Sequence, residues 1–208
     1  MIVSISRELG AGGGTVGEAV AAALGAKLLD ERAMLDELAR RLRFSPDALE
    51  QSVERPPTLG ETLIANLARS AAMMEGTEVY QTREEEVIET VRSIVLDYAE
   101  HGDVVVIGHG GISLLGWRPA TPVVLSILLK AGQQWRIEQL ARRFSIDIEE
   151  ARRRIKRTDE ARVAYQKHFF RTNIYDVKQY DLVIDTERLG LDLTISLATS
   201  AVRRLTAV

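Results

Sequence analysis

A glycine-rich segment near the start of the chain is the part of the sequence best suited to binding a charged ligand. Four of the five residues at positions 10–14 are glycine, and Thr15 follows them. An apolar run at residues 2–5 predicts a buried strand, and the apolar spacing after Thr15 predicts a helix. In such a strand–loop–helix unit the loop amides approach an anion, and the helix N-terminus adds partial positive charge. The segment therefore indicates a phosphate-binding loop formed by Gly10, Ala11, Gly12, Gly13, Gly14 and Thr15.

The lysine of the usual phosphate-loop motif is absent. Gly13 stands where a Gly-Lys-Ser/Thr sequence would place it. Arg7, at the end of the predicted strand, is the candidate for the missing charge, because a guanidinium can bind phosphate with two parallel hydrogen bonds. A surface ion pair between Arg7 and Glu8 or another acid is an equal alternative. A loop without a compensating charge would bind nucleotide and turn it over slowly.

Two other interpretations of the glycines remain open. The spacing Gly12-x-Gly14-x-x-Gly17 also fits a dinucleotide-binding fingerprint, with Asp30 at the end of the second strand as the ribose-binding acid. A dinucleotide fold would continue with alternating strands and helices, whereas residues 31–100 show helical patterns only. A tight turn without a ligand is disfavoured, since each surplus glycine costs roughly 0.5–1 kcal/mol.

A second feature is a basic segment at residues 142–171. It holds ten arginines and lysines against five acids, although the whole chain has a net charge of -3. For any one arginine a solvated helix face with ion pairs is the better interpretation. The cluster as a whole favours a lid, because positioned arginines stabilise the charge on a transferring phosphoryl group.

Composition bounds the remaining possibilities. The 208 residues are 46% hydrophobic and 27% charged, as in an ordinary globular protein. The chain contains no cysteine, which excludes disulfides and thiol catalysis. Neither a signal peptide nor a membrane-spanning run is evident, and the charge suggests no nucleic-acid or membrane partner. We expect a cytoplasmic protein that binds a nucleotide and a small-molecule acceptor, and the sequence is compatible with a homodimer.

The secondary-structure pattern predicts one α/β domain that would position these residues. Short apolar strands separated by helices predict a five-stranded parallel sheet with helices on both faces. The predicted strands are residues 2–5, 25–30, 103–108, 121–128 and 180–185. The predicted helices are residues 15–24, 31–42, 58–74, 82–100, 133–144, 148–157 and 191–205.

The order of these motifs resembles the P-loop nucleoside monophosphate kinases, and within them the cytidylate kinase-like family. The resemblance rests on residues 5–13, 27–30, 106–108, 136–138, 158–162 and 180–186. It implies a P-loop NTPase fold as a single domain over residues 1–208, with ATP as donor and Mg²⁺ as counter-ion. The implied parts are a core (1–30, 101–141 and 178–208), a helical acceptor-binding insertion (31–100) and a lid (142–177).

The resemblance also implies roles for single residues. Residues 10–15 would hold the donor phosphates, and the Thr15 hydroxyl would bind the metal. Arg136 would lie near the adenine or the phosphates. The implied acceptor-binding residues are Asp30, Arg32, His109, Asp159 and Arg162, and the implied catalytic residues are Asp30, Arg157 and Arg162.

The chain departs from the pattern of cytidylate kinases at positions that bear on the acceptor. His109 and Asp36 stand where acceptor-binding arginines would be expected, and no acid ends the strand at Ile107. His109 would bind an acceptor, act as a base, or cap its glycine-rich turn. We expect ATP-dependent phosphoryl transfer to a small acceptor, with a nucleotide as one candidate. A catalytically weak nucleotide-binding regulatory protein and a dinucleotide-binding protein are the alternatives.

Overall fold

The computed structural model describes residues 1–42, 77–115 and 124–206. In chain order the elements are β1 (Ile2–Arg7), α1 (Gly13–Leu24), β2 (Lys27–Leu29), α2 (Glu31–Leu42), α5 (Thr77–Glu100), β3 (Val104–Ile107), α6 (Gly111–Leu115), β4 (Val124–Lys130), α7 (Gln133–Phe144), α8 (Ile148–Phe170), the 3-10 helix η1 (Val177–Gln179), β5 (Leu182–Asp185) and α9 (Thr186–Thr206). The predicted helix at residues 58–74 lies outside the described residues.

The described strands form one five-stranded sheet in the order β2-β3-β1-β4-β5, and every neighbouring pair is parallel. This confirms the predicted α/β architecture. β1 lies in the middle, with Ile5 opposite Ile107 of β3 and Ile127 of β4. β3 and β2 lie on one side of β1, and β4 and β5 lie on the other. Parallel sheets bind ligands at the carboxyl end of the strand at which the order changes side in this way. The loop after β1 therefore lies at the functional edge of the sheet.

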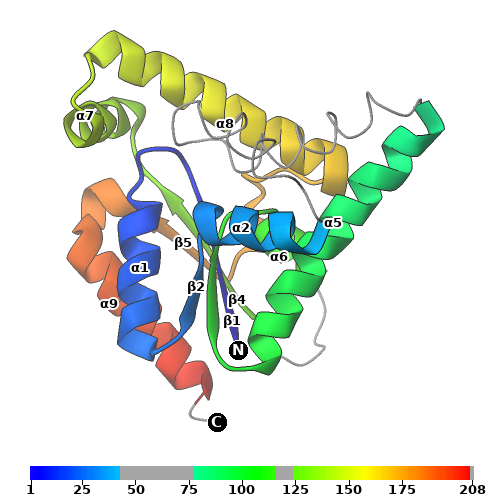
Figure 1. Cartoon of the computed structure of the whole chain (residues 1–208). Coiled ribbons are helices and arrows are strands. Elements are labelled where there is room, and N and C mark those ends of the chain that lie inside the picture. The colour runs from blue at the N-terminus through cyan, green and yellow to red at the C-terminus, as the bar shows by residue number, and fades with distance from the viewer. Residues whose placement is uncertain (43–76, 116–123, 207–208) are drawn as a thin grey trace.

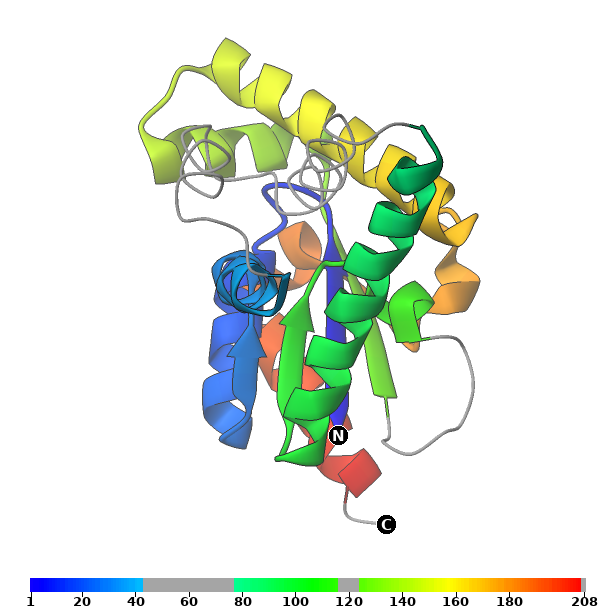
Figure 2. The same ribbon diagram turned by 45° about the vertical axis from the view of Figure 1, so that its right-hand side comes forward.

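Alternation along β1 explains the two helical layers. Val3 and Ile5 pack with Val16 of α1 and Ala198 of α9 in one apolar cluster. Ile2, on the other face, packs with residues of α2, α5 and β3 in a second cluster. Figure 1 shows α1 and α9 on one side of the sheet and α5 on the other, and Figure 2 shows the same arrangement from a second direction. A strand buried on both faces reads as a continuous apolar run, as residues 2–5 nearly do.

Helices α7 and α8 lie over the end of the sheet that is opposite the N-terminus (Figures 1 and 2). They pack on each other through a third apolar cluster that includes Ile137, Leu140 and Ile155. Because that end carries the loop after β1, these two helices are placed to cover it.

The structure corrects several predicted boundaries. α8 continues to Phe170, beyond the predicted end at residue 157. The reason is that Thr158 and Arg162 are buried on its packed face, where an apolar pattern would be expected. α9 begins at Thr186, earlier than predicted, but Gly190 has non-helical angles that divide it. The short helix α6 was not predicted.

Candidate phosphate-binding site

The loop between β1 and α1 has a backbone shape that requires glycine. Gly10 and Gly12 have φ angles of 87° and 80°, in the left-handed region that side chains disfavour. A Cβ atom on Gly10 would also lie 2.7 Å from the carbonyl oxygen of Arg136. Both glycines therefore permit the turn of the loop, and they allow its close approach to α7 at Gly10 and to Leu191 of α9 at Gly12.

The N-terminus of α1 presents amides that the helix itself does not use. The first helical hydrogen bond runs from the Val16 amide to the Gly12 carbonyl at 3.0 Å, and no side chain caps the helix. The amides of Gly13, Gly14 and Thr15 precede that bond, so an anion can accept from them. The Thr15 side chain is exposed beside them. The residues predicted to bind phosphate are thus brought together at a helix N-terminus.

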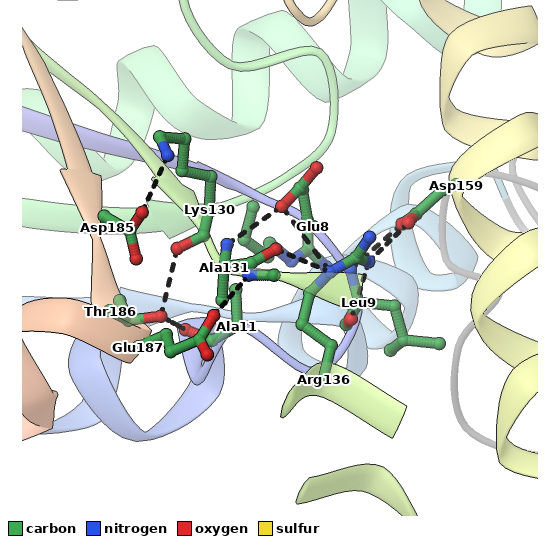
Figure 3. Close-up of polar contacts among 12 residues, drawn as sticks. Glu8, Leu9, Ala11, Lys130, Ala131, Arg136, Asp159, Asp185, Thr186 and Glu187 are labelled. Carbon is green, nitrogen blue, oxygen red and sulfur yellow. Dashed lines mark hydrogen bonds and ion pairs between the residues drawn. The ribbon is translucent and has the colours of Figure 1, made fainter. Parts of the chain in front are cut away.

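Contacts from β4, β5 and α9 fix the loop from one side (Figure 3). The buried Thr186 hydroxyl is 3.0 Å from the Ala11 carbonyl and 3.2 Å from the Lys130 carbonyl. The Glu8 carboxylate accepts from the Ala131 amide at 3.0 Å. The loop is therefore held in one shape by residues at the ends of β4 and β5, the two strands on one side of β1, which favours a preorganised anion site.

Arg136 and Asp159 fix the loop from the other side (Figure 3). Arg136 is buried, and its Nη1 donates to the Leu9 carbonyl at 3.1 Å and to Asp159 Oδ2 at 2.6 Å. Its Nε donates to the Ala131 carbonyl and lies 3.6 Å from Glu8. Asp159 Oδ1 accepts from the Leu9 amide at 3.0 Å. One buried ion pair thus joins the loop, α7 and α8.

Arg162 adds a second connection between α8 and β1. Its Nη1 donates to the Arg7 carbonyl at 3.1 Å and lies 3.8 Å from Asp159 Oδ1. The structure therefore brings together Arg136, Asp159 and Arg162, which were predicted to contact nucleotide or acceptor. The contacts described above are with the protein backbone, with one another and, for Arg136, with the Glu8 carboxylate, and their contacts to ligands stay predictions.

Three other predicted acceptor or catalytic residues have no described contact with this network: Asp30, Arg32 and Arg157. Asp30 accepts from the Ala33 amide at 2.9 Å and so caps α2. Arg32 is exposed and pairs with Asp36 at 3.1 Å. Arg157 is exposed on α8. These contacts are local to α2, and the acceptor-binding and catalytic roles of Asp30, Arg32 and Arg157 stay predictions.

His109 follows β3 in a turn of unusual shape. It is buried, with a φ of 58°, and Gly108, Gly110 and Gly111 also have positive φ angles. A Cβ on Gly111 would lie 3.0 Å from the hydroxyls of both Ser4 and Ser6 on β1. The turn is therefore packed tightly against the central strand, at the same edge of the sheet as the phosphate loop.

Glu8, Thr186 and Tyr175 belong to the site region but were not predicted. Tyr175 is 41% exposed, and its partial burial, together with the nearby carboxylates Asp159 and Glu8, raises the pKa of its phenol to about 12. No motif marks these three positions, although Glu8 and Thr186 lie within the segments that carry the family resemblance.

The residues present fit a magnesium ion held mainly by a bound nucleotide. Within the described residues no group of three or more histidines or acids could hold a metal by itself. Mg²⁺ in phosphoryl-transfer sites is bound largely by phosphates and water with few protein ligands. The exposed Thr15 hydroxyl at the start of α1 suits that role.

In the part of the chain that the structure describes, no helix is long and apolar enough to cross a membrane.

The parallel sheet has helices on both faces, and a glycine loop joins its central strand to α1. Its order β2-β3-β1-β4-β5 is that of the P-loop NTPase fold, whereas the dinucleotide-binding fold has its second strand beside the first. A solved structure of an uncharacterized protein from Eubacterium ventriosum shares this fold with a TM-score of 0.66, 15% identity and 98% coverage of each chain. TT1252 from Thermus thermophilus has a TM-score of 0.55 at 18% identity, over 98% of this chain and 97% of that one.

The profile of the cytidylate kinase-like family matches residues 2–188, and the chain belongs to that family. The cytidylate kinase of Methanothrix thermoacetophila is 25% identical over 205 residues, which cover 99% of both chains. The cytidylate kinase of Methanopyrus kandleri is 40% identical over 78 residues, which cover 38% of this chain and 40% of that enzyme. The family expected from the sequence is thus confirmed.

Proposed function

We propose that this protein transfers the γ-phosphoryl group of ATP to a nucleoside monophosphate, with cytidine monophosphate as the first acceptor to test. The observation that carries the proposal is the uncapped N-terminus of α1, which follows a rigidly held glycine loop at the edge of the central strand. Membership of the cytidylate kinase-like family and the names of the relatives support the same reaction class.

In the proposed reaction an oxygen of the acceptor phosphate attacks the γ-phosphorus. The bond from that phosphorus to the β–γ bridging oxygen breaks, and ADP leaves. Magnesium, when bound, neutralises charge on the phosphate oxygens. The amides of Gly13, Gly14 and Thr15 bind the donor phosphates at the positive end of α1. Arg157 on the exposed face of α8 closes over the transferring group.

Asp159 and Arg162 have a positioning role in this proposal. They connect α8 to the phosphate loop through the Leu9 amide and the Arg7 carbonyl. Because α8 is attached to the loop by these two contacts, its Arg157 is held at a defined distance from the bound phosphates. The acceptor itself would lie on the side of His109, whose turn ends β3 at the same edge of the sheet.

A coupled assay of ADP release tests the proposal. With ATP and Mg²⁺, we expect turnover with one member of a panel of cytidine, uridine, adenosine and deoxycytidine monophosphates, well above the rate with ATP alone. Dependence of ADP release on an acceptor from another class, such as a nucleoside or a hydroxy acid, would refute the monophosphate acceptor.

The second candidate is a nucleotide-binding protein with little catalysis, which the glycine at position 13 favours. A rise in melting temperature with ATP and no ADP release with any acceptor would support it. Stabilisation by NAD and not by ATP would refute both candidates and favour the dinucleotide-binding alternative.

A further inference from the structure

The two glycines that open α1 each lie against an arginine from another part of the chain. A Cβ on Gly13 would lie 2.7 Å from Cγ, 3.0 Å from Cβ and 3.2 Å from Cδ of Arg7. A Cβ on Gly14 would lie 3.8 and 3.9 Å from the two terminal guanidinium nitrogens of Arg143. Arg7 comes from the end of β1 and Arg143 from the last turn of α7.

The space above Gly13 explains why that residue is glycine. Gly13 lies within α1 and is not among the glycines with positive φ, so its backbone would accept any L-residue. Only the stem of Arg7 forbids a side chain there, since the contacts involve atoms next to its backbone and not its flexible end. Arg7 therefore fills the volume in which the side chain of a phosphate-loop lysine would begin.

Arg143 has an exposed side chain whose charge is not neutralised by an acid in the described part of the chain. Its described contact is with the ring of Phe144, whose centroid is 5.8 Å from the guanidinium carbon. The neighbouring Arg142 is also exposed, but its Nε donates to the Glu138 carbonyl of its own helix at 3.3 Å. Of these two arginines, Arg143 is the one whose guanidinium is described beside Gly14 of the phosphate loop, whereas the described bond of Arg142 is to its own helix.

We propose that Arg7 and Arg143 together supply the positive charge that a lysine supplies in other phosphate loops. Arg7 supplies the charge that a lysine at position 13 would supply, and Arg143 provides a second cation beside Gly14. Both bind oxygens of the donor triphosphate, since a guanidinium forms two charge-assisted hydrogen bonds to phosphate. The inference rests on the proposed nucleotide site and names the residues that make it competent without a lysine.

Moving the positive charge from position 7 to position 13 tests the role of Arg7. Calorimetric titration with ATP·Mg²⁺ and with inorganic triphosphate is measured for Arg7→Ala, Gly13→Lys and the double variant Arg7→Ala/Gly13→Lys. We expect about tenfold or greater loss of affinity for each single variant, the first from lost charge and the second from the clash with Arg7. The double variant should regain most of the affinity, because alanine removes the Cγ and Cδ of Arg7 and leaves only its Cβ, at 3.0 Å, in close contact with the charged new side chain.

Arg143→Ala is compared with Arg142→Ala in the same titrations. The first should weaken binding of both probes by about tenfold, and the second by less than about twofold. Equal affinities of these two variants would overturn the role of Arg143. A folded double variant, with the melting temperature of Arg7→Ala, that binds no better than Arg7→Ala would overturn the role of Arg7.

The design separates this inference from the function on which it rests. If the wild-type protein binds neither ATP nor triphosphate, the nucleotide site itself is refuted. If the wild type binds both probes, and if Arg7→Ala and Arg143→Ala each bind them as tightly as the wild type does, the nucleotide site stands and the two-arginine inference fails. Should Gly13→Lys fold poorly, Arg7→Lys serves as the second variant, and its affinity should lie between those of the wild type and Arg7→Ala.

Discussion

Arg136 lies buried between the phosphate loop and α8, with its guanidinium bonded to Leu9, Ala131 and Asp159. Arg136→Met would leave the Asp159 carboxylate without its main charged partner in a half-buried site. Loss of one member of a buried pair typically costs about 3–5 kcal/mol. We therefore expect the free energy of unfolding in urea to fall by about that amount.

Arg32→Met is the matched control, because Arg32 forms an exposed ion pair with Asp36. Exposed pairs contribute about 0–1 kcal/mol, so this variant should change stability little. Similar losses for the two variants would contradict the structural role assigned to Arg136.

The stability of the fold at low pH should depend on Glu37 of α2. Hydrogen bonds from Arg40 and then from Arg41 lower the pKa of Glu37 from 4.5 to about 2, against the opposing effect of burial. A carboxylate whose pKa is lower in the folded state stabilises the fold above its ordinary pKa. That contribution is complete above pH 4.5 and is lost as the pH falls toward 2.

Urea unfolding of wild type and Glu37→Gln at a series of pH values measures this effect. The wild type should be more stable at pH 7, and the difference between the two proteins should shrink as the pH falls from about 4.5 toward 2. A difference that stays constant over this range would show that the carboxylate charge contributes nothing.

Part of the candidate site could be predicted from the sequence, because that part depends on local rules. A cluster of glycines before an apolar helical pattern can be recognised from a few neighbouring residues. The structure forms residues 10–15 into a loop and the start of α1. Glu8, Thr186 and Tyr175 were missed because their partners are distant. Thr186 bonds to Ala11, which lies 175 residues away in the chain, and no local pattern encodes such a contact.

At the scale of elements, α8 shows why one boundary was predicted wrongly. Its buried face changes from Ala151 and Ile155 to Thr158 and Arg162, so the apolar period ends although the helix does not. Arg162 on that face donates to the Arg7 carbonyl at the end of β1, and the adjacent Asp159 accepts from the Leu9 amide of the loop, so polar contacts replace the missing apolar ones. Burial of paired polar side chains is thus the physical reason for the error.

The start of α8 offers a test of how firmly this helix is formed. Asp147 caps it, since its Oδ1 accepts from the Glu150 amide at 2.7 Å. Asp147→Ala should lower the free energy of unfolding by about 1 kcal/mol, because one amide of the first turn loses its partner. Asp147→Asn keeps the acceptor and should retain most of the stability. Equal stabilities of the alanine and asparagine variants in urea would contradict the cap.

At the scale of the whole molecule, the sheet was predictable in composition and direction. Apolar strands separated by helices predict parallel pairing. The order β2-β3-β1-β4-β5 was not predicted, because apolar strands of similar composition can pair in several orders. That order places β1 between β3 and β4, so the phosphate loop lies beside the His109 turn. The division into core, insertion and lid stays a prediction.

The connection between loop and lid gives a prediction for the molecule as a whole. Nucleotide that binds the loop should stabilise α8, since Asp159 and Arg162 join the two. At 100 times its dissociation constant, ATP·Mg²⁺ should raise the free energy of unfolding by about 2.7 kcal/mol. Amide hydrogen exchange should slow in the middle of α8, around Thr158 and Arg162, and change little in α9 beyond Gly190. In Asp159→Asn the protection of α8 by nucleotide should shrink while the loop remains protected. Equal protection of α8 in both proteins would show that the lid responds to nucleotide by another route.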